Sequence, residues 1–230
     1  MQIGENIKKI KENIADAARR AGRREDEVKL MGVSKFFPRE AVEAALQSGL
    51  TLFGESRVQE AMQKLSGLRG ADCGFELHLI GALQRNKAKN AAMFFDGIDS
   101  LDRLEIIQSL GELTTGCKKR LMVLLELNSG EEQKGGFRGQ DALKHAAELV
   151  LGFNGLKLCG LMTVAPFSGD KKIVRAAFRA LANARRMLCA EFGEEHFPVL
   201  SMGMSGDYEI AIEEGATLVR IGTAIFGERE

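Results

Sequence analysis

The 230-residue chain has 32 basic and 32 acidic residues, so no net charge draws it toward nucleic acid or a membrane surface. Hydrophobic residues make up 45% of it, and no apolar run approaches the length of a membrane span. A chain of this length forms one large α/β domain or two small ones. The charged N-terminal segment is unlike a secretory signal, and the four cysteines form no Cys-x-x-Cys pair, so we expect a cytoplasmic protein with reduced thiols. The three histidines have no metal-ligand spacing, so we expect no metal site.

Residues 2–22 begin the chain with isoleucine and alanine at helical spacing, which predicts an amphipathic helix that ends near Gly22. Short apolar runs that end in polar or glycine residues then recur along the chain, and each predicts a buried parallel strand. These strands are expected at residues 29–35, 50–56, 75–81, 94–100, 121–128, 156–163, 198–203 and 217–222. The helices between them are expected at residues 38–48, 58–68, 84–93, 102–113 and 171–192. Another helix is expected between the loop at 129–139 and residue 151, and the last one from residue 205 or 207 to residue 215.

The number and order of these elements define the expected fold. Eight strands alternate with helices, and no linker rich in Pro, Gly or Ser divides the chain. Eight βα units in one domain of residues 1–230 predict an α/β fold, a TIM (β/α)8 barrel with an extra N-terminal helix. A doubly wound open sheet is the alternative fold for the same alternation.

Lys35 stands at the C-terminal end of the first predicted strand, after the apolar residues Leu30, Met31 and Val33. Ligands bind at this end of the strands in barrels and in doubly wound sheets. The Lys35 amine would therefore point into the mouth of the barrel, while Pro38 fits the first turn of the next helix. A solvated lysine at a strand end is the alternative interpretation of this stretch taken alone.

Two glycine-containing loops follow the last two predicted strands, at residues 201–206 and 220–223. In many barrels these two loops hold a phosphate group with backbone N–H groups and hydroxyls, and ordinary tight turns are the alternative. A lysine opposite such a phosphate site suits a Schiff base with a phosphorylated carbonyl compound. Pyridoxal 5'-phosphate (PLP) fits this description, and so does a sugar-phosphate aldol substrate.

Arg220 and His78 are two further candidates for contacts to a bound ring. A permanent cation at Arg220 would oppose protonation of a pyridine nitrogen and would weaken a cofactor as an electron sink. The alternative is a salt bridge from Arg220 to a neighbour such as Glu55. His78 is either a hydrogen-bond donor near the ring of a bound cofactor or a core histidine whose hydrogen bonds are all made within the protein.

Seven segments in chain order resemble the YggS/PROSC family of PLP homeostasis proteins, which is related to the N-terminal barrel of alanine racemase. The segments span nearly the whole chain and are residues 33–35, 53–60, 78–87, 128–132, 160–163, 200–205 and 219–229. The resemblance implies a single PLP-binding barrel without the β-rich second domain of alanine racemase. It also implies that Lys35 forms a Schiff base with PLP.

The same resemblance implies the other cofactor contacts. Ser201, Gly222 and Thr223 would hold the phosphate, and Arg220 would face the pyridine nitrogen. Met202 and Met204 would shape the pocket. The remaining residues that we expect to bind the cofactor are Ser56, His78 and Gly203.

The chain departs from the family pattern at positions close to the expected ring. Ser56 stands where the family usually has Asn, Leu77 replaces the usual Trp, and Ala82 replaces the usual His. Phe36 and Phe37 replace a polar pair. We therefore expect the ring contacts to differ from those of the family more than the lysine or the phosphate site does.

The resemblance also bears on whether the protein is an enzyme. Related racemases use a lysine and a tyrosine on opposite faces of the cofactor, and the tyrosine comes from the domain that is missing here. Tyr208 is the only tyrosine of this chain, and nothing marks it as a second base. We therefore expect a monomeric protein that holds PLP and buffers it or delivers it to PLP-dependent apo-enzymes. The alternatives are a PLP enzyme with modest racemase or lyase activity and a cofactor-free Schiff-base aldolase.

Overall fold

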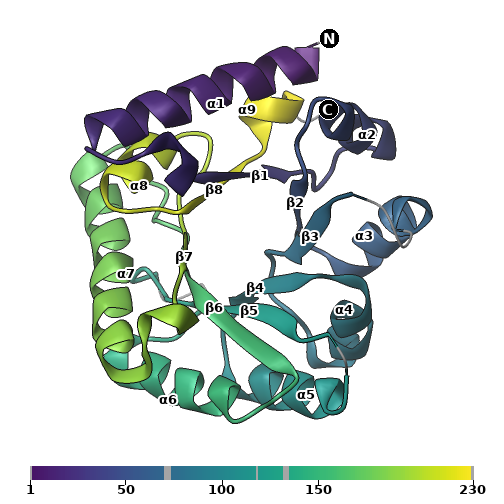
Figure 1. Ribbon diagram of the computed structural model, residues 1–230, viewed down its shortest axis with the longest axis vertical. Helices are drawn as coiled ribbons and strands as arrows, with labels where there is room; N and C mark the ends of the chain where they lie inside the picture. Colours follow the sequence, from purple (N-terminus) through teal and green to yellow (C-terminus); the bar gives the residue numbers. More distant parts are fainter. Residues whose placement is uncertain (1, 70–73, 118, 132–134, 229–230) are drawn as a thin grey trace.

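The computed structural model describes residues 2–69, 74–117, 119–131 and 135–228. Eight parallel strands form a closed barrel in sequential order, in which β1 pairs with both β2 and β8 (Figure 1). The strands are β1 (Lys29–Val33), β2 (Leu52–Glu55), β3 (Glu76–Leu79), β4 (Gly97–Leu101), β5 (Leu121–Glu126), β6 (Leu156–Met162), β7 (Val199–Ser201) and β8 (Leu218–Ile221). This closed barrel confirms the predicted TIM fold and excludes the open doubly wound sheet.

Helices surround the barrel, as Figure 1 shows. They are α1 (Gln2–Arg20), α2 (Arg39–Gln47), α3 (Val58–Leu65), α4 (Ala88–Phe94), α5 (Leu104–Thr114), α6 (Gly139–Leu151), α7 (Lys171–Phe192), α8 (Tyr208–Glu213) and α9 (Thr223–Phe226). Single 3₁₀ turns are η1 (Glu25–Glu27), η2 (Ser66–Leu68), η3 (Arg85–Lys87) and η4 (Glu194–His196).

The predicted extra N-terminal helix is α1, and it packs across the seam where β8 meets β1, next to α8 and α9 (Figure 1). Asn6 donates a hydrogen bond of 2.9 Å to the carbonyl oxygen of Ile225, and Asn13 donates one of 3.2 Å to the Tyr208 hydroxyl. Ile7, Ile10 and other apolar residues of α1 are buried, as their spacing predicts. The helix therefore ties the first strand to the last.

Side chains on each strand alternate between two environments because successive residues of a strand point to opposite faces. Outward-facing residues such as Leu30, Leu77 and Leu158 join the helices in one continuous apolar core. The inward-facing residues Leu124, Cys159 and Met162 form only a small separate cluster. The barrel interior therefore leaves space for polar side chains and for cavities at both of its ends.

Some local predictions are wrong in detail. The fourth strand begins at Gly97 rather than at residue 94, because Phe94 is the last residue of α4. The helix predicted to begin at residue 102 begins at Leu104, its N-cap position is Arg103, and no side chain caps it. Asp207 does precede α8, yet its carboxylate accepts a hydrogen bond from the backbone N–H of Met204 and caps no N–H of the helix.

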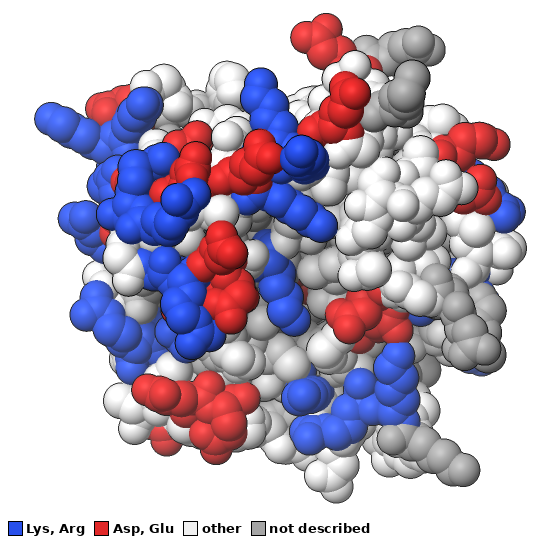
Figure 2. Space-filling model, turned by 45° about the horizontal axis from the view of Figure 1, so that its top comes forward, with Lys and Arg blue, Asp and Glu red and all other residues white. Residues whose placement is uncertain are grey.

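The surface carries charges of both signs. Acidic and basic side chains are interspersed over the face shown in Figure 2, in keeping with 32 residues of each kind. Within the described ranges, no helix has the length and apolar character needed to cross a membrane. Cys117, Cys159 and Cys189 are free thiols, and Cys73 lies outside the described residues.

Candidate functional site

A cavity of about 380 Å³ opens at the C-terminal ends of the strands, where Lys35 lies. Lys35 and Arg220 line it from the ends of β1 and β8, and the loop after β7 adds Ser205 and Gly206. The volume lies within the range of small-molecule sites in proteins. The location agrees with the general rule that TIM barrels bind their ligands at this face. We refer to it as the Lys35 cavity.

Lys35 lies in a tight turn directly after β1. The backbone N–H of Phe37 donates a hydrogen bond of 3.0 Å to the Ser34 carbonyl oxygen, which closes the turn around Lys35 and Phe36. Phe36 has a φ of 70°, and it is the one non-glycine residue of the described chain with a positive φ. Turns of type II require this conformation at their third position, which usually holds glycine. The residue next to the candidate nucleophile is therefore held in a strained conformation.

Lys64 of α3 supports this turn from behind. Its ammonium nitrogen lies 2.8 Å from the carbonyl oxygen of Ser34 and 3.1 Å from that of Phe37. The same nitrogen lies 2.5 Å from Oε1 of Glu55, which also accepts a hydrogen bond of 2.6 Å from the Ser34 hydroxyl. Glu55 is only 1% exposed, so this is a buried charge pair. Glu55 thus pairs with Lys64 and not with Arg220, the partner that the sequence left open.

Arg220 is a buried cation at the base of the Lys35 cavity. Its guanidinium donates hydrogen bonds of 2.7 Å to the Ser201 hydroxyl and 2.8 Å to the Thr163 carbonyl oxygen. Burial lowers the pKa of Arg220, and the carboxylates of Asp99, Glu126 and Asp207 act in the opposite direction. An arginine remains charged under these conditions, so a fixed positive charge faces the cavity.

The loops after β7 and β8 approach each other at the cavity wall. Gly203 has a φ of 95°, and a Cβ atom there would lie 2.7 Å from the Cβ of Ala211, so only glycine fits. The backbone N–H of Ala224 reaches the Ser205 hydroxyl at 3.5 Å, which links the two loops. Among the described backbone hydrogen bonds outside helices and strands, the N–H of Gly222 donates none. Convergent backbone N–H groups and a hydroxyl suit an anionic group such as a phosphate.

The structure brings together four of the residues that the sequence analysis selected. Lys35, Arg220, Gly222 and Thr223 all line the Lys35 cavity. Met204, which the resemblance places at the pocket, lines it too. The lysine, the cation and the candidate phosphate loops therefore lie within reach of one small ligand.

The other selected residues lie outside the lining of this cavity. Ser201 is fully buried, and its hydroxyl accepts the hydrogen bond from Arg220. Met202 packs in the outer core, and Gly203 forms the turn against α8. The described residues that line the cavity do not include Ser56, which follows β2 and is half-buried.

His78 lies in β3 and lines a different cavity, at the N-terminal ends of the strands. Its Nδ1 atom lies 2.8 Å from Oδ1 of Asp99, so the ring is held by a buried carboxylate. The sequence predicts His78 at the C-terminal end of its strand, whereas the strand continues to Leu79 and the His78 side chain lines the cavity at the N-terminal end of the barrel.

The cavity also contains residues that the sequence analysis did not select. Ser205 and Gly206 lie in a segment that carries the family resemblance, so that segment was a signal for them. Ile80 follows the alternation of Glu76 and His78 and therefore faces inward. Phe167 is fully exposed in the loop after β6, and no pattern in the sequence marked it as part of the site.

Only one of the departures from the family pattern touches the cavity. Phe37 lines it, whereas the Phe36 side chain is exposed outside it. Leu77 is buried in the outer core and Ala82 is exposed, and neither is part of the lining. Among the residues that the structure describes, no three His, Cys, Asp or Glu side chains are arranged to hold a metal ion.

Comparison with known proteins agrees with this geometry. Residues 6–230 match the family described as "Alanine racemase, N-terminal domain". The chain is 41% identical over 231 residues to the "Pyridoxal phosphate homeostasis protein" of Aquifex aeolicus, and the match covers 100% of both chains. It is 42% identical over 229 residues to the protein of the same name from Pseudomonas aeruginosa, covering 99% of this chain and 96% of the relative.

Solved structures show the same relationship. The structure of PipY from Synechococcus elongatus PCC7942 with PLP bound matches with a TM-score of 0.85 and 29% identity, covering 98% of this chain and 100% of that one. An alanine racemase from Clostridium difficile matches with a TM-score of 0.71 and 14% identity over 55% of its own length, which shows a common fold alone. The chain therefore belongs to the alanine racemase N-terminal domain family, together with the pyridoxal phosphate homeostasis proteins.

Proposed function

We propose that this protein binds PLP in the Lys35 cavity and takes part in PLP homeostasis, by buffering the cofactor or delivering it to PLP-dependent apo-enzymes. The observation that carries the proposal is that Lys35, Arg220, Gly222 and Thr223 line one cavity of suitable size. The names of the relatives and the PLP bound to PipY support it. The proposal includes a single barrel domain that acts as a monomer in the cytoplasm.

Each residue has a stated role in this proposal. The Lys35 amine would hold PLP covalently through the aldehyde carbon of the cofactor, as a Schiff base formed with the release of one water molecule. Ser205, Gly222 and Thr223 would hold the phosphate through the Ser205 hydroxyl and backbone N–H groups. Bound PLP supplies a reactive aldehyde and an electron-withdrawing ring. Arg220 would face the ring nitrogen and oppose its protonation, which would limit the use of that ring in catalysis.

Tyr208 favours a carrier over an enzyme. The hydroxyl of this only tyrosine accepts a hydrogen bond from Asn13 of α1, and the residue is buried there instead of lining the Lys35 cavity. A racemase needs two proton-transferring groups on opposite faces of its substrate, and no tyrosine of this chain is available for the second face. A PLP enzyme with weak racemase or lyase activity is the second candidate, with Lys35 as its proton carrier.

The visible absorbance spectrum of the purified protein, before and after borohydride reduction, tests the proposal. We expect a yellow protein whose colour is lost on reduction. The reduced cofactor should remain attached as a label on the peptide that contains Lys35. Lys35→Ala should abolish the label, while Lys89→Ala on the exposed side of α4 should keep it. A label on another lysine, or a colourless protein that takes up no PLP, would reject the assignment. Robust racemisation of amino acids that depends on Lys35 would favour the enzyme.

A further inference from the structure

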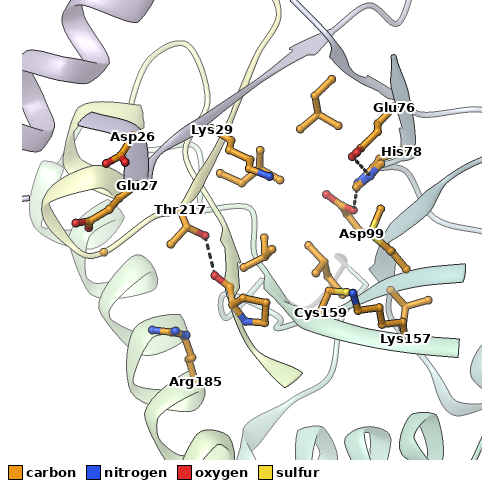
Figure 3. A pocket seen from close by; sticks show the side chains of 18 of the residues that line it. Asp26, Glu27, Lys29, Glu76, His78, Asp99, Lys157, Cys159, Arg185 and Thr217 are labelled. Atoms are coloured by element: carbon orange, nitrogen blue, oxygen red, sulfur yellow. Dashed lines mark hydrogen bonds and ion pairs between the residues drawn. The ribbon is translucent and has the colours of Figure 1, made fainter. Parts of the chain in front are cut away.

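A second cavity, of about 650 Å³, opens at the N-terminal ends of the strands, and Figure 3 shows the residues that line it. The first residue of β1, Lys29, lines this cavity, whereas the last one, Val33, lines the Lys35 cavity. The two cavities therefore lie at the two ends of the same strand. We refer to the second one as the Lys29 cavity.

His78 and Asp99 form the buried polar part of the Lys29 cavity. His78 is 9% exposed and Asp99 is 1% exposed, and His78 Nδ1 lies 2.8 Å from Asp99 Oδ1. Neither His78 Nε2 nor Asp99 Oδ2 has a hydrogen-bond partner among the described residues. Buried polar atoms in native proteins are nearly always paired, so these two atoms beside one cavity are available to the polar group of a ligand or to water.

The position of the imidazole ring is fixed by its neighbours. Gly97 of β4 lies directly under it, because a Cβ atom at this position would come within 2.8 Å of His78 Cε1. Burial alone lowers the pKa of His78, but the carboxylates of Asp99, Glu76 and Asp96 raise it above its ordinary value overall. This raised pKa favours the protonated ring, whose Nε2–H group is a donor for a carboxylate.

The remaining charges of the Lys29 cavity are of both signs. Lys29 extends into the cavity from β1, across from Glu76, His78 and Asp99 (Figure 3). Within the described residues, the ammonium groups of Lys29 and Lys157 form no ion pair or hydrogen bond. The Glu76 carboxylate lies 3.8 Å from His78 Nε2, beyond hydrogen-bonding distance. A ligand with a single charge would meet groups of its own sign here.

The rest of the lining is apolar. Leu52, Leu124 and Leu218 contribute aliphatic walls, and burial raises the pKa of the nearby Cys159 thiol, which favours its neutral form. An apolar wall beside paired charges is typical of a site that takes a small molecule with an apolar body and a polar end.

We propose that the Lys29 cavity binds an α-amino acid with an apolar side chain. The carboxylate of the ligand lies between the Lys29 ammonium and His78 Nε2, and its ammonium group contacts the Glu76 carboxylate. Because these two ligand groups sit on one carbon atom, they can reach the neighbouring His78 and Glu76 together. The aliphatic side chain packs on Leu52 and Leu124. This site is separate from the proposed PLP site and does not require it.

Calorimetric titration of the full chain with leucine tests this proposal. The Lys35→Ala variant is used for the titration, because it has no Schiff base between Lys35 and PLP that leucine could enter by exchange. We expect saturable binding of leucine, and binding about tenfold weaker or more for 4-methylpentanoate and for 3-methylbutylamine, which each lack one charged group. The absence of saturable leucine binding, or equal binding of either analogue, would overturn the proposal. Neither result depends on whether PLP binds at Lys35.

Variants of the same protein locate the ligand. Lys29→Met and Glu76→Gln replace exposed residues at strand beginnings, and each should weaken leucine binding about tenfold. Gly97→Ala should weaken it further by displacing the His78 ring. Lys9→Met and Glu12→Gln on the exposed side of α1 are the matched controls and should leave it unchanged. Unchanged binding in both cavity variants of correctly folded protein would place the ligand elsewhere and reject the site.

Discussion

The ammonium nitrogen of Lys64 lies 2.8 Å from the carbonyl oxygen of Ser34, the residue that precedes Lys35. The same nitrogen lies 2.5 Å from the buried Glu55 carboxylate, and it also contacts the Phe37 carbonyl oxygen. One side chain from α3 therefore holds both ends of the turn that presents Lys35. This arrangement couples the stability of the barrel to the geometry of its candidate nucleophile.

Removal of this cation should destabilise the protein strongly. Lys64→Met leaves the Glu55 carboxylate buried without a counter-ion, and we expect the free energy of unfolding to fall by about 3 kcal/mol. The double variant Lys64→Met with Glu55→Gln should recover part of this loss, because no lone charge remains buried. Urea unfolding of the two single variants and the double variant measures the coupling between them. Strictly additive losses would contradict the pairing.

The strained turn allows a second prediction. Phe36 adopts a positive φ of 70°, which is unfavourable for any residue with a Cβ atom. Phe36→Gly and Phe36→Ala both remove the exposed ring, but only glycine removes the strain. The glycine variant should therefore be the more stable of the two, by about 1 kcal/mol in urea unfolding. Equal stabilities would show that the turn relaxes at no cost.

Variants at two serines can distinguish a side chain that binds the phosphate from one that supports Arg220. The Ser205 hydroxyl lines the Lys35 cavity, whereas the Ser201 hydroxyl bonds to Arg220. Ser205→Ala should weaken the affinity for PLP about tenfold while leaving that for pyridoxal, which has no phosphate, nearly unchanged. Ser201→Ala should change both affinities alike. The opposite pattern, measured by absorbance titration, would assign the phosphate to Ser201.

Asp96 gives a prediction for acid stability. Burial alone would raise the pKa of Asp96, but hydrogen bonds from Arg69, Lys119 and the Leu77 N–H hold it at about 2, below its ordinary value of 3.8. Because the folded-state pKa is lowered, this carboxylate stabilises the fold above pH 4 and loses that contribution as the pH falls toward 2.

The corresponding variant is Asp96→Asn. At pH 7 it should lower the free energy of unfolding by roughly 2 kcal/mol, and its stability should decline less between pH 4 and pH 2 than that of the parent protein. Asp141→Asn on the exposed side of α6 is the control and should follow the parent curve. Parallel pH curves for Asp96→Asn and the parent would refute the prediction.

Most of the fold could be predicted from sequence because each buried strand is a short apolar run between polar segments. The prediction that the fourth strand begins at Phe94 was wrong, since an apolar pair such as Phe94 and Phe95 is equally suited to the end of a buried helix. The structure resolves the ambiguity by packing the two rings edge to face, with centroids 5.6 Å apart, at the end of α4. Such packing depends on the tertiary structure and leaves no periodic signal.

The candidate site was predictable only in part. Lys35 and Arg220 lie near strand ends, where the barrel rule applies. His78 has the same inward alternation as Ile80, yet the two residues line different cavities, because a step of two residues shifts a side chain by about 6.6 Å along the strand. A sequence shows which side chains of a strand face inward, but it does not show at which end of the barrel interior each of them lies. The support from Lys64 was also invisible, because it reaches the turn from a separate helix.

The pairing of β1 with β8, closed over by α1, has a consequence for the order of events during synthesis. Lys35 leaves the ribosome long before Arg220, Gly222 and Thr223 are translated. A nascent chain that stops short of β8 therefore displays a reactive amine with nothing to hold an anion next to it. In the proposed site, the contacts to the phosphate can form only after β8 has been made and has paired with β1 to close the barrel.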